Sequence, residues 1–195
     1  MKKGWLALCT AALLLLPSAA FAETDESEVT VTGNGLQMTQ TQPRFADVTL
    51  NVKSTQTSQA SNDLYVMDAR GTAAGWGITL RATDFKLTRI IDGAAVDFVI
   101  PASAVSYTAT YKGALAGTAI DFAQGKGELA AAKVLSSTDE RIVGVIPSEG
   151  AGTHQIGVAY HLAVPKSLTG SNGKTVGLLQ GTYTATWTYT ATAGI

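Results

Sequence analysis

The sequence predicts an all-β fold, mainly antiparallel, arranged as a single β-sandwich or barrel-like domain. Two observations support this prediction. In several segments every second residue is apolar, which is what a strand with one buried and one solvent-exposed face requires. Turns rich in glycine separate these segments, and many short strands joined by turns are typical of a sandwich or barrel. The order of the strands within the sheets does not follow from the residues.

The predicted strands differ in the regularity of their alternation. Trp76, Ile78 and Leu80 alternate with small or polar neighbours. In the last segment, residues 183, 185, 187 and 189 share one face while threonines occupy the other. Threonine and aromatic residues favour a pleated, half-buried surface. In chain order, the predicted strands lie at residues 29–32, 48–53, 64–67, 76–81, 95–100, 105–111, 156–164 and 182–190.

Turn signals separate these strands. They lie at residues 33–35, 92–93, 125–127, 150–152 and 171–173, where glycine and asparagine favour tight turns. The polar segment 56–62 is predicted to be a long hairpin loop rather than a linker. The alanine-rich stretch 128–135 is compatible with a short helix or with a strand. No domain boundary is visible, so one core is expected.

The first residues predict export. Lys2 and Lys3 precede an apolar run at residues 6–16, and Ala20-Phe21-Ala22 matches a signal peptidase site, so residues 1–22 are expected to be a signal peptide and residues 23–195 the mature domain. The apolar run has about half the ~20 residues that a membrane-spanning helix needs, and no later segment is long enough. Cleavage also removes Cys9, the single cysteine, so the mature domain must be stabilised by burial without a disulfide.

Charge excludes two classes of partner. The mature chain begins with a cluster of acids at residues 23–28, which is typical of a solvated tail, and the remaining body is close to neutral. A neutral body lacks the basic stripe of a nucleic-acid-binding protein. It does not suggest an anionic-membrane binder either.

The residues also argue against catalysis. The predicted mature domain has no cysteine and no G-x-S-x-G motif, and its histidines are His154 and His161. Seven residues apart on one strand, these histidines face opposite ways and lack metal-site spacing. We therefore expect no enzymatic activity, no metal and no cofactor. Carboxylates that could in principle form a glycosidase pair lie mostly near glycine turns, where acids are commonly just solvated, at Asp84, Asp92, Asp97, Asp121, Glu128 and Glu149.

Two motifs resemble those of the WxL family of Gram-positive cell-surface proteins. The first comprises residues 64–71 with 75–80 and contains Trp76 and Ile78, and the second comprises residues 185–190 and contains Trp187 and Tyr189. Residues 100–101 and 181–183 also look like family landmarks, so the likeness covers the mature chain. The family name has leucine two places after tryptophan, whereas this chain has isoleucine and tyrosine, which keep an apolar side chain on the same strand face.

The resemblance implies an exported protein held noncovalently on peptidoglycan, at the cell wall or cell surface, often acting with surface proteins encoded nearby. The chain ends at residues 193–195 without a sorting motif, a hydrophobic tail or a basic cluster, so any surface attachment is expected to be noncovalent. Two functions remain open. The domain either binds peptidoglycan itself, or it is a noncatalytic subunit whose exposed strand edge, such as the threonine-rich last strand, pairs with a partner that supplies the wall attachment.

The motif residues have structural alternatives as well. Trp76 and Trp187 could stack on sugar rings, but their alternation with apolar neighbours, including Ile78 and Tyr189, favours a place in the core. Asp68 and Arg70 could contact a ligand, or they could bracket a tight turn through an ordinary exposed ion pair, which is the favoured interpretation.

Overall fold

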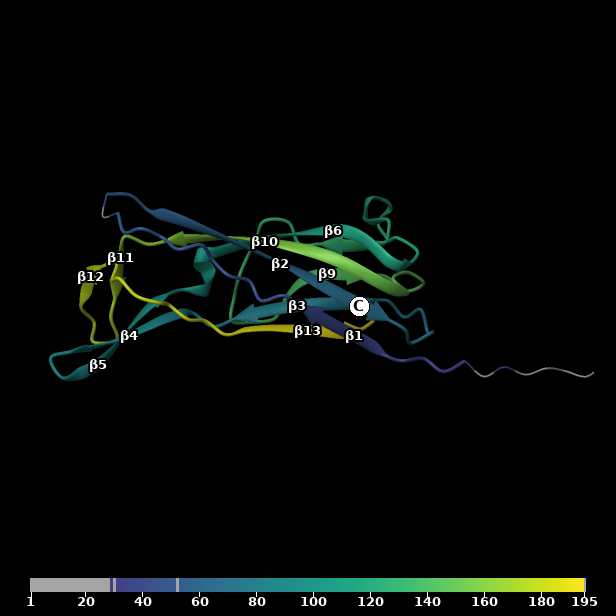
Figure 1. Cartoon of the computed structure of the whole chain (residues 1–195), viewed down its shortest axis with the longest axis horizontal. Helices are drawn as coiled ribbons and strands as arrows, with labels where there is room; N and C mark the ends of the chain where they lie inside the picture. Colours follow the sequence, from purple (N-terminus) through teal and green to yellow (C-terminus); the bar gives the residue numbers. More distant parts are fainter. Residues whose placement is uncertain (1–28, 30, 52, 195) are drawn as a thin grey trace, which may run out of the picture. The chain divides into compact units, whose positions relative to one another are not determined.

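The computed structural model describes residue 29 and residues 31–51 and 53–194 (Figure 1). The chain divides into two compact units, Met1–Val31 and Thr32–Ile195, and the strands of the described chain belong to the second. The predicted signal peptide, residues 1–22, lies outside the described residues. No helix in the described ranges has the length and apolar character needed to cross a lipid bilayer.

The second unit consists of antiparallel sheets. One sheet has the strand order β1-β2-β10-β6-β8, the other has the order β13-β3-β9-β7, and β4-β5 and β11-β12 form two separate hairpins. Two short 3-10 helices, η1 (Ala102–Ala104) and η2 (Phe122–Gln124), complete the described elements. The strands are β1 (Leu36–Gln40), β2 (Gln56–Asp68), β3 (Trp76–Ala82), β4 (Phe85–Ile91), β5 (Ala94–Ile100), β6 (Val105–Gly117), β7 (Gly127–Leu129), β8 (Lys133–Val134), β9 (Glu140–Val145), β10 (Gly152–Val164), β11 (Ser167–Thr169), β12 (Thr175–Gly177) and β13 (Trp187–Ala193).

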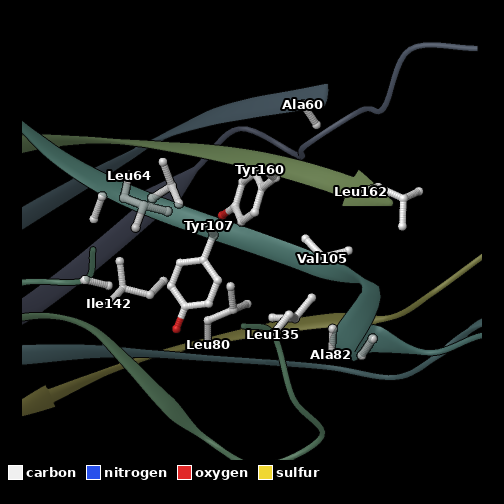
Figure 2. Packing of buried hydrophobic residues seen from close by; sticks show 14 of the residues in the cluster. Ala60, Leu64, Leu80, Ala82, Val105, Tyr107, Leu135, Ile142, Tyr160 and Leu162 are labelled. Carbon is white, nitrogen blue, oxygen red and sulfur yellow. The ribbon is translucent and has the colours of Figure 1, made fainter. Parts of the chain in front are cut away.

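The core lies between the two larger sheets. Figure 2 shows Leu64, Tyr107 and Tyr160 of the five-stranded sheet directed toward Leu80 of β3 and Ile142 of β9, and all five side chains are buried. Burial of apolar side chains on the inward faces is the main stabilising contribution to such a domain. The prediction of an all-β, antiparallel, sandwich-like domain is therefore confirmed.

The predicted hairpin loop at residues 56–62 is wrong, because this segment is the first half of β2. Its inward-facing residues are Ser58, Ala60 and Asn62, which are small or polar and yet buried. A strand whose buried face carries polar side chains shows no apolar alternation, so the pattern concealed it. Asn62 is accommodated because it hydrogen-bonds to two tyrosines, as described below.

Other predictions need correction as well. Residues 48–51 and 53 form no strand, and neither do residues 29, 31 and 32; Val52 and Thr30 lie outside the described residues. Although 48–53 alternates, a strand needs a neighbour to pair with. Within the described residues, segment 42–50 bonds to β2 through the main chain only at Ala46, which donates to Gln59 O (3.2 Å). Of the two alternatives left open for the stretch 128–135, a short helix or a strand, the structure has the strand, since the stretch contributes to β7 and β8. In the last predicted strand, regular pairing starts at Trp187.

The two hairpins lie at one end of the long strands. In Figure 1, β4-β5 and β11-β12 lie at the left, and the start of β1 and the end of β13 lie toward the right. An isolated bridge between Phe98 of β5 and Gly170, which follows β11, joins the two hairpins. The Asp92-Gly93 turn, where both residues have a positive φ, joins β4 to β5, as the turn signal predicted.

Candidate functional site

Trp76 lies in the core. Its side chain is 0% exposed, its indole Nε1 donates to Gly150 O at 2.9 Å, and its ring packs against His154 with centroids 5.9 Å apart. Ile78, two residues along β3, is also fully buried. The first motif therefore presents neither side chain to a ligand.

Trp187 and Tyr189 have a different environment, because both are only partly buried. They begin β13, which pairs with β3 and forms an edge of the four-stranded sheet. The Tyr189 hydroxyl lies 2.8 Å from the Tyr160 hydroxyl and accepts from Asn62 Nδ2 at 3.1 Å. The second motif is thus the one whose tryptophan remains partly accessible.

Trp187 lines a cavity of about 640 Å³, which we call the edge cleft. The edge strands β1 and β13 contact each other, so the corresponding edges of the two sheets lie on the same side of the domain. Two irregular segments, residues 42–50 and 178–185, form the walls of the edge cleft, and side chains from β2, β4, β5, β10 and β13 form its floor. The volume is within the range of about 300–1,000 Å³ that is usual for ligand sites.

Trp187, on the floor of the edge cleft, belongs to an aromatic cluster that also includes Phe45 of one wall and the buried Tyr160. The Trp187 ring meets Tyr160 edge-to-face, with centroids 5.0 Å apart and an interplanar angle of 85°. It also approaches Phe85 and Phe45, each with a centroid distance of 6.3 Å. Edge-to-face packing adds about 0.5–1.5 kcal/mol per pair beyond the area buried, so these contacts fix the orientation of the indole.

A buried polar network supports this floor from beneath. Tyr160 donates to Asn62 Oδ1 at 3.0 Å, and Asn62 Nδ2 donates to Thr41 O at 3.0 Å, just before the wall segment 42–50. Burial raises the pKa of Tyr160 and that of Tyr189 above the ordinary tyrosine value, so both hydroxyls stay protonated at neutral pH. The network therefore connects β2, β10, β13 and one wall of the edge cleft.

Asp68 and Arg70 do form an ion pair, but it is not the exposed pair that the sequence suggested. Their side chains are 3% and 14% exposed, and Arg70 Nε and Nη2 donate to the two Asp68 oxygens at 2.8 Å each. Arg70 Nη2 also donates to Gly75 O at 2.6 Å, which closes the β2–β3 loop. The hydrogen bonds from Arg70 hold the pKa of Asp68 below its usual value. The pair lies at the end of β2 opposite the edge cleft, whose lining includes Ser58.

The two histidines face opposite sides of β10. His161 is exposed, whereas His154 is 0% exposed, with Nδ1 3.0 Å from the Tyr111 hydroxyl and Nε2 3.3 Å from Ala151 O. These contacts fit a neutral ring that accepts at Nδ1 and donates at Nε2. Burial lowers the pKa of His154, although the nearby Asp68 carboxylate acts in the opposite direction.

Acidification is therefore expected to destabilise the domain through His154. As the pH falls, the unfolded chain takes up a proton at the ordinary histidine pKa of about 6.5, whereas the folded state does so at a lower pH. The free energy of unfolding therefore falls below about pH 6.5, by at most about 1.4 kcal/mol per pH unit. Urea unfolding at a series of pH values measures this slope. His154→Gln should flatten it, and the same substitution at the exposed His161 is the matched control. Equal slopes for the wild type and His154→Gln would contradict the assignment.

Four of the six carboxylates that the sequence raised for a glycosidase pair, Asp84, Asp97, Asp121 and Glu149, are engaged in local contacts. Asp84 accepts from the Ala102 amide at 2.8 Å, Asp121 accepts from two amides at the start of η2, and Glu149 forms an ion pair with Lys126 at 3.0 Å. No group of three or more His, Cys, Asp or Glu side chains able to hold a metal ion occurs among the described residues. The edge cleft has Arg44 and Asp47 as its charged lining residues.

Several residues of the edge cleft were not identified from the sequence. Phe45, Phe85, Leu162 and Tyr183 line it, although none of them belongs to the two motifs considered as binding residues. Phe45 lies shortly before residues 48–53, whose alternation wrongly suggested a strand. The signal available in the sequence was that Phe45 is an isolated aromatic residue two positions after Pro43.

Comparisons with known proteins were made on both sequence and structure. No family model matches the chain, and no curated protein matches it significantly. Among solved structures, the chain has a weak similarity to the collagen binding domain of the Erysipelothrix rhusiopathiae surface protein RspB, with 10% identity and a TM-score of 0.22. The alignment covers 84% of this chain and 61% of that one, so the chain spans less than two thirds of the similar structure. The molecule is an antiparallel sandwich-like domain with an aromatic cleft at one edge.

Proposed function

We propose that this protein is a noncatalytic, exported surface protein of the WxL type, and that it associates noncovalently with the Gram-positive cell wall by binding peptidoglycan in the edge cleft. The observation that carries the proposal is the contrast between the two motif tryptophans. Trp76 is sealed in the core, whereas Trp187 remains partly accessible on the floor of a cleft of about 640 Å³. Concave, largely apolar sites with a few polar groups are the usual form of a ligand site.

The absence of catalysis belongs to the same proposal. His154, one of the two histidines, is buried with both ring nitrogens engaged, and the other, His161, is outside the lining of the edge cleft. Within the described chain, the lining carries a single carboxylate, Asp47, and a retaining or inverting glycosidase needs two. Binding therefore fits this site better than hydrolysis.

Cosedimentation of the purified protein with protein-free peptidoglycan tests the proposal. We expect saturable binding by the wild type, and a loss of affinity of at least about tenfold for Leu50→Glu, because the new carboxylate would enter an apolar contact without a partner. Leu50 lines the edge cleft and is 45% exposed, so this change should spare the fold. Trp187→Ala should weaken binding as well, provided that circular dichroism shows a native spectrum.

Leu115→Glu is the matched control. Leu115 lies in β6, is 61% exposed and is not part of the edge cleft, so the same charge change there should leave sedimentation unaltered. Equal binding by the wild type and Leu50→Glu would rule out the edge cleft as the contact. No sedimentation of the wild type would rule out direct binding to peptidoglycan.

The second candidate function is assembly with a partner protein that supplies the attachment. It is favoured by the position of β13 at an edge of its sheet, where the main chain can accept another strand. Wall binding that requires an added surface protein, and that is absent for the purified chain, would support this alternative.

A further inference from the structure

The walls of the edge cleft carry main-chain groups without partners in the described chain. In segment 42–50, Ala46 N–H to Gln59 O is the one main-chain hydrogen bond found among the described residues. On the opposite wall, residues 179–183 make no main-chain to main-chain hydrogen bond with any described residue. Among the described residues, no main-chain hydrogen bond joins the two walls. Two irregular segments therefore face each other with free amide and carbonyl groups, which require partners from solvent or from a ligand.

Some carbonyl groups of these walls are already held by side chains. Tyr183 donates its hydroxyl to Leu179 O at 2.9 Å, and Arg89 Nη2 donates to Gln180 O. Ser58 donates to Ala46 O at 2.5 Å. These bonds fix the course of both walls while leaving the amides of residues 180–182 free, so the unpaired donors occupy defined positions.

The floor is better suited to small apolar side chains than to a sugar ring. Stacking of a sugar requires one open face of an aromatic ring. The Trp187 ring packs against Tyr160, Phe85 and Phe45, at centroid distances of 5.0, 6.3 and 6.3 Å, so it is one member of a cluster and not an isolated platform. Its Nε1 makes no hydrogen bond within the described residues, which leaves one polar donor in the apolar floor.

The charge of the lining is also informative. Among the residues that the structure describes, the two charged side chains of the lining are Arg44 and Asp47, whose charges cancel, and Arg89 beside the cleft already bonds to Gln180 O. A lining without net charge gives no preference for an anionic wall polymer, since recognition of phosphate or carboxylate groups relies on clustered cations. The occupant should therefore carry little net charge at this site.

We infer that the edge cleft takes an extended peptide, namely a peptide of the peptidoglycan network, which lies between segments 42–50 and 178–185 as an added strand. Its main chain pairs with the free amides and carbonyls of both walls, and its small side chains contact the Phe45, Phe85 and Trp187 cluster. Addition of an extended peptide obtains affinity from main-chain hydrogen bonds, which do not depend on the identity of the side chains. This inference rests on the proposed function and specifies which part of the wall the cleft recognises.

Fragments of one wall preparation test the inference. An amidase that cuts between the glycan and its peptides yields peptide-free glycan strands and sugar-free cross-linked peptides, and each fraction competes with intact peptidoglycan for the purified protein. The peptides should displace it and the glycan should not. Displacement by the glycan alone, or by neither fraction, would overturn the inference while leaving wall binding established. No binding to intact peptidoglycan would instead remove the proposed function on which it rests.

Nuclear magnetic resonance supplies an independent readout. Saturating wall peptides should slow hydrogen exchange of the amides at residues 180–182 by at least about tenfold and shift the Trp187 Nε1–H resonance, since both would become hydrogen-bonded or shielded. The Gly71 and Thr72 amides, in the β2–β3 loop at the other end of β2, are the control and should not change. Binding without protection at residues 180–182 would contradict strand addition.

Discussion

Replacing Trp76 with alanine is expected to lower the free energy of unfolding by about 3–5 kcal/mol, which is the usual cost of removing a large buried aromatic side chain. Trp76 is 0% exposed, lies between His154 and the rest of the core, and donates to Gly150 O. The substitution leaves a cavity and an unsatisfied buried carbonyl. Urea unfolding followed by circular dichroism measures the loss without relying on tryptophan fluorescence.

Trp187→Ala is the natural comparison for this prediction. Trp187 is only partly buried and lines the edge cleft, so its removal opens a space that water can enter. We expect a smaller loss of stability than for Trp76→Ala, combined with a loss of wall binding. A loss as large as that of Trp76→Ala would mean that the second motif serves the core and not the cleft.

The second large effect is expected for Asp68→Asn. Removing one partner of a buried ion pair leaves an uncompensated charge and costs about 3–5 kcal/mol, and here Arg70 would remain at 14% side-chain exposure. The matched control is Asp63→Asn, because Asp63 pairs with Lys112 at an exposed site where about 1 kcal/mol or less is expected. Urea unfolding at neutral pH compares the two.

The pH dependence of Asp68→Asn provides a further check. Hydrogen bonds from Arg70 lower the pKa of Asp68, so its stabilising contribution is fully present above the ordinary aspartate pKa of about 3.8 and is lost as the pH falls through the lower folded value. The stabilities of the wild type and Asp68→Asn should therefore differ at neutral pH and converge at strongly acidic pH. A difference that persists unchanged into acid would show that the effect is steric.

Apolar alternation was sufficient for the strands that bury apolar residues. It predicted the parts of β3, β5, β6 and β10 that face the core, because their inward-facing side chains, such as Ile78 and Tyr160, are apolar or aromatic and are buried. It missed the start of β2, where Ser58 and Asn62 face inward, since their burial depends on hydrogen bonds to residues distant in the chain. It also predicted a strand at 48–53, because alternation does not reveal whether a neighbouring strand is present to complete the ladder.

The candidate site was only partly accessible to the same reasoning. Trp187 could be singled out, but Trp76 has the same local pattern, and its burial follows from the loop that places Gly150 O within hydrogen-bonding distance. The edge cleft joins residues from the beginning, middle and end of the chain, such as Phe45, Phe85 and Trp187. Which distant segments meet is a property of strand order, and strand order is not encoded in local periodicity.

The closure of the β2–β3 loop has a mechanical consequence. Asn34 donates to Ala69 O at 2.7 Å and Gly194 donates to Gly75 O at 3.0 Å, so the chain enters and leaves the domain beside the same loop. When the points of entry and exit are close together, a domain can be inserted into a longer polypeptide without separating the segments on either side. Tension between these two points would peel β1 and β13 from their sheets one hydrogen bond at a time, and would not shear the long central strands. The edge cleft, at the far ends of β2 and β13, would point away from such a tether.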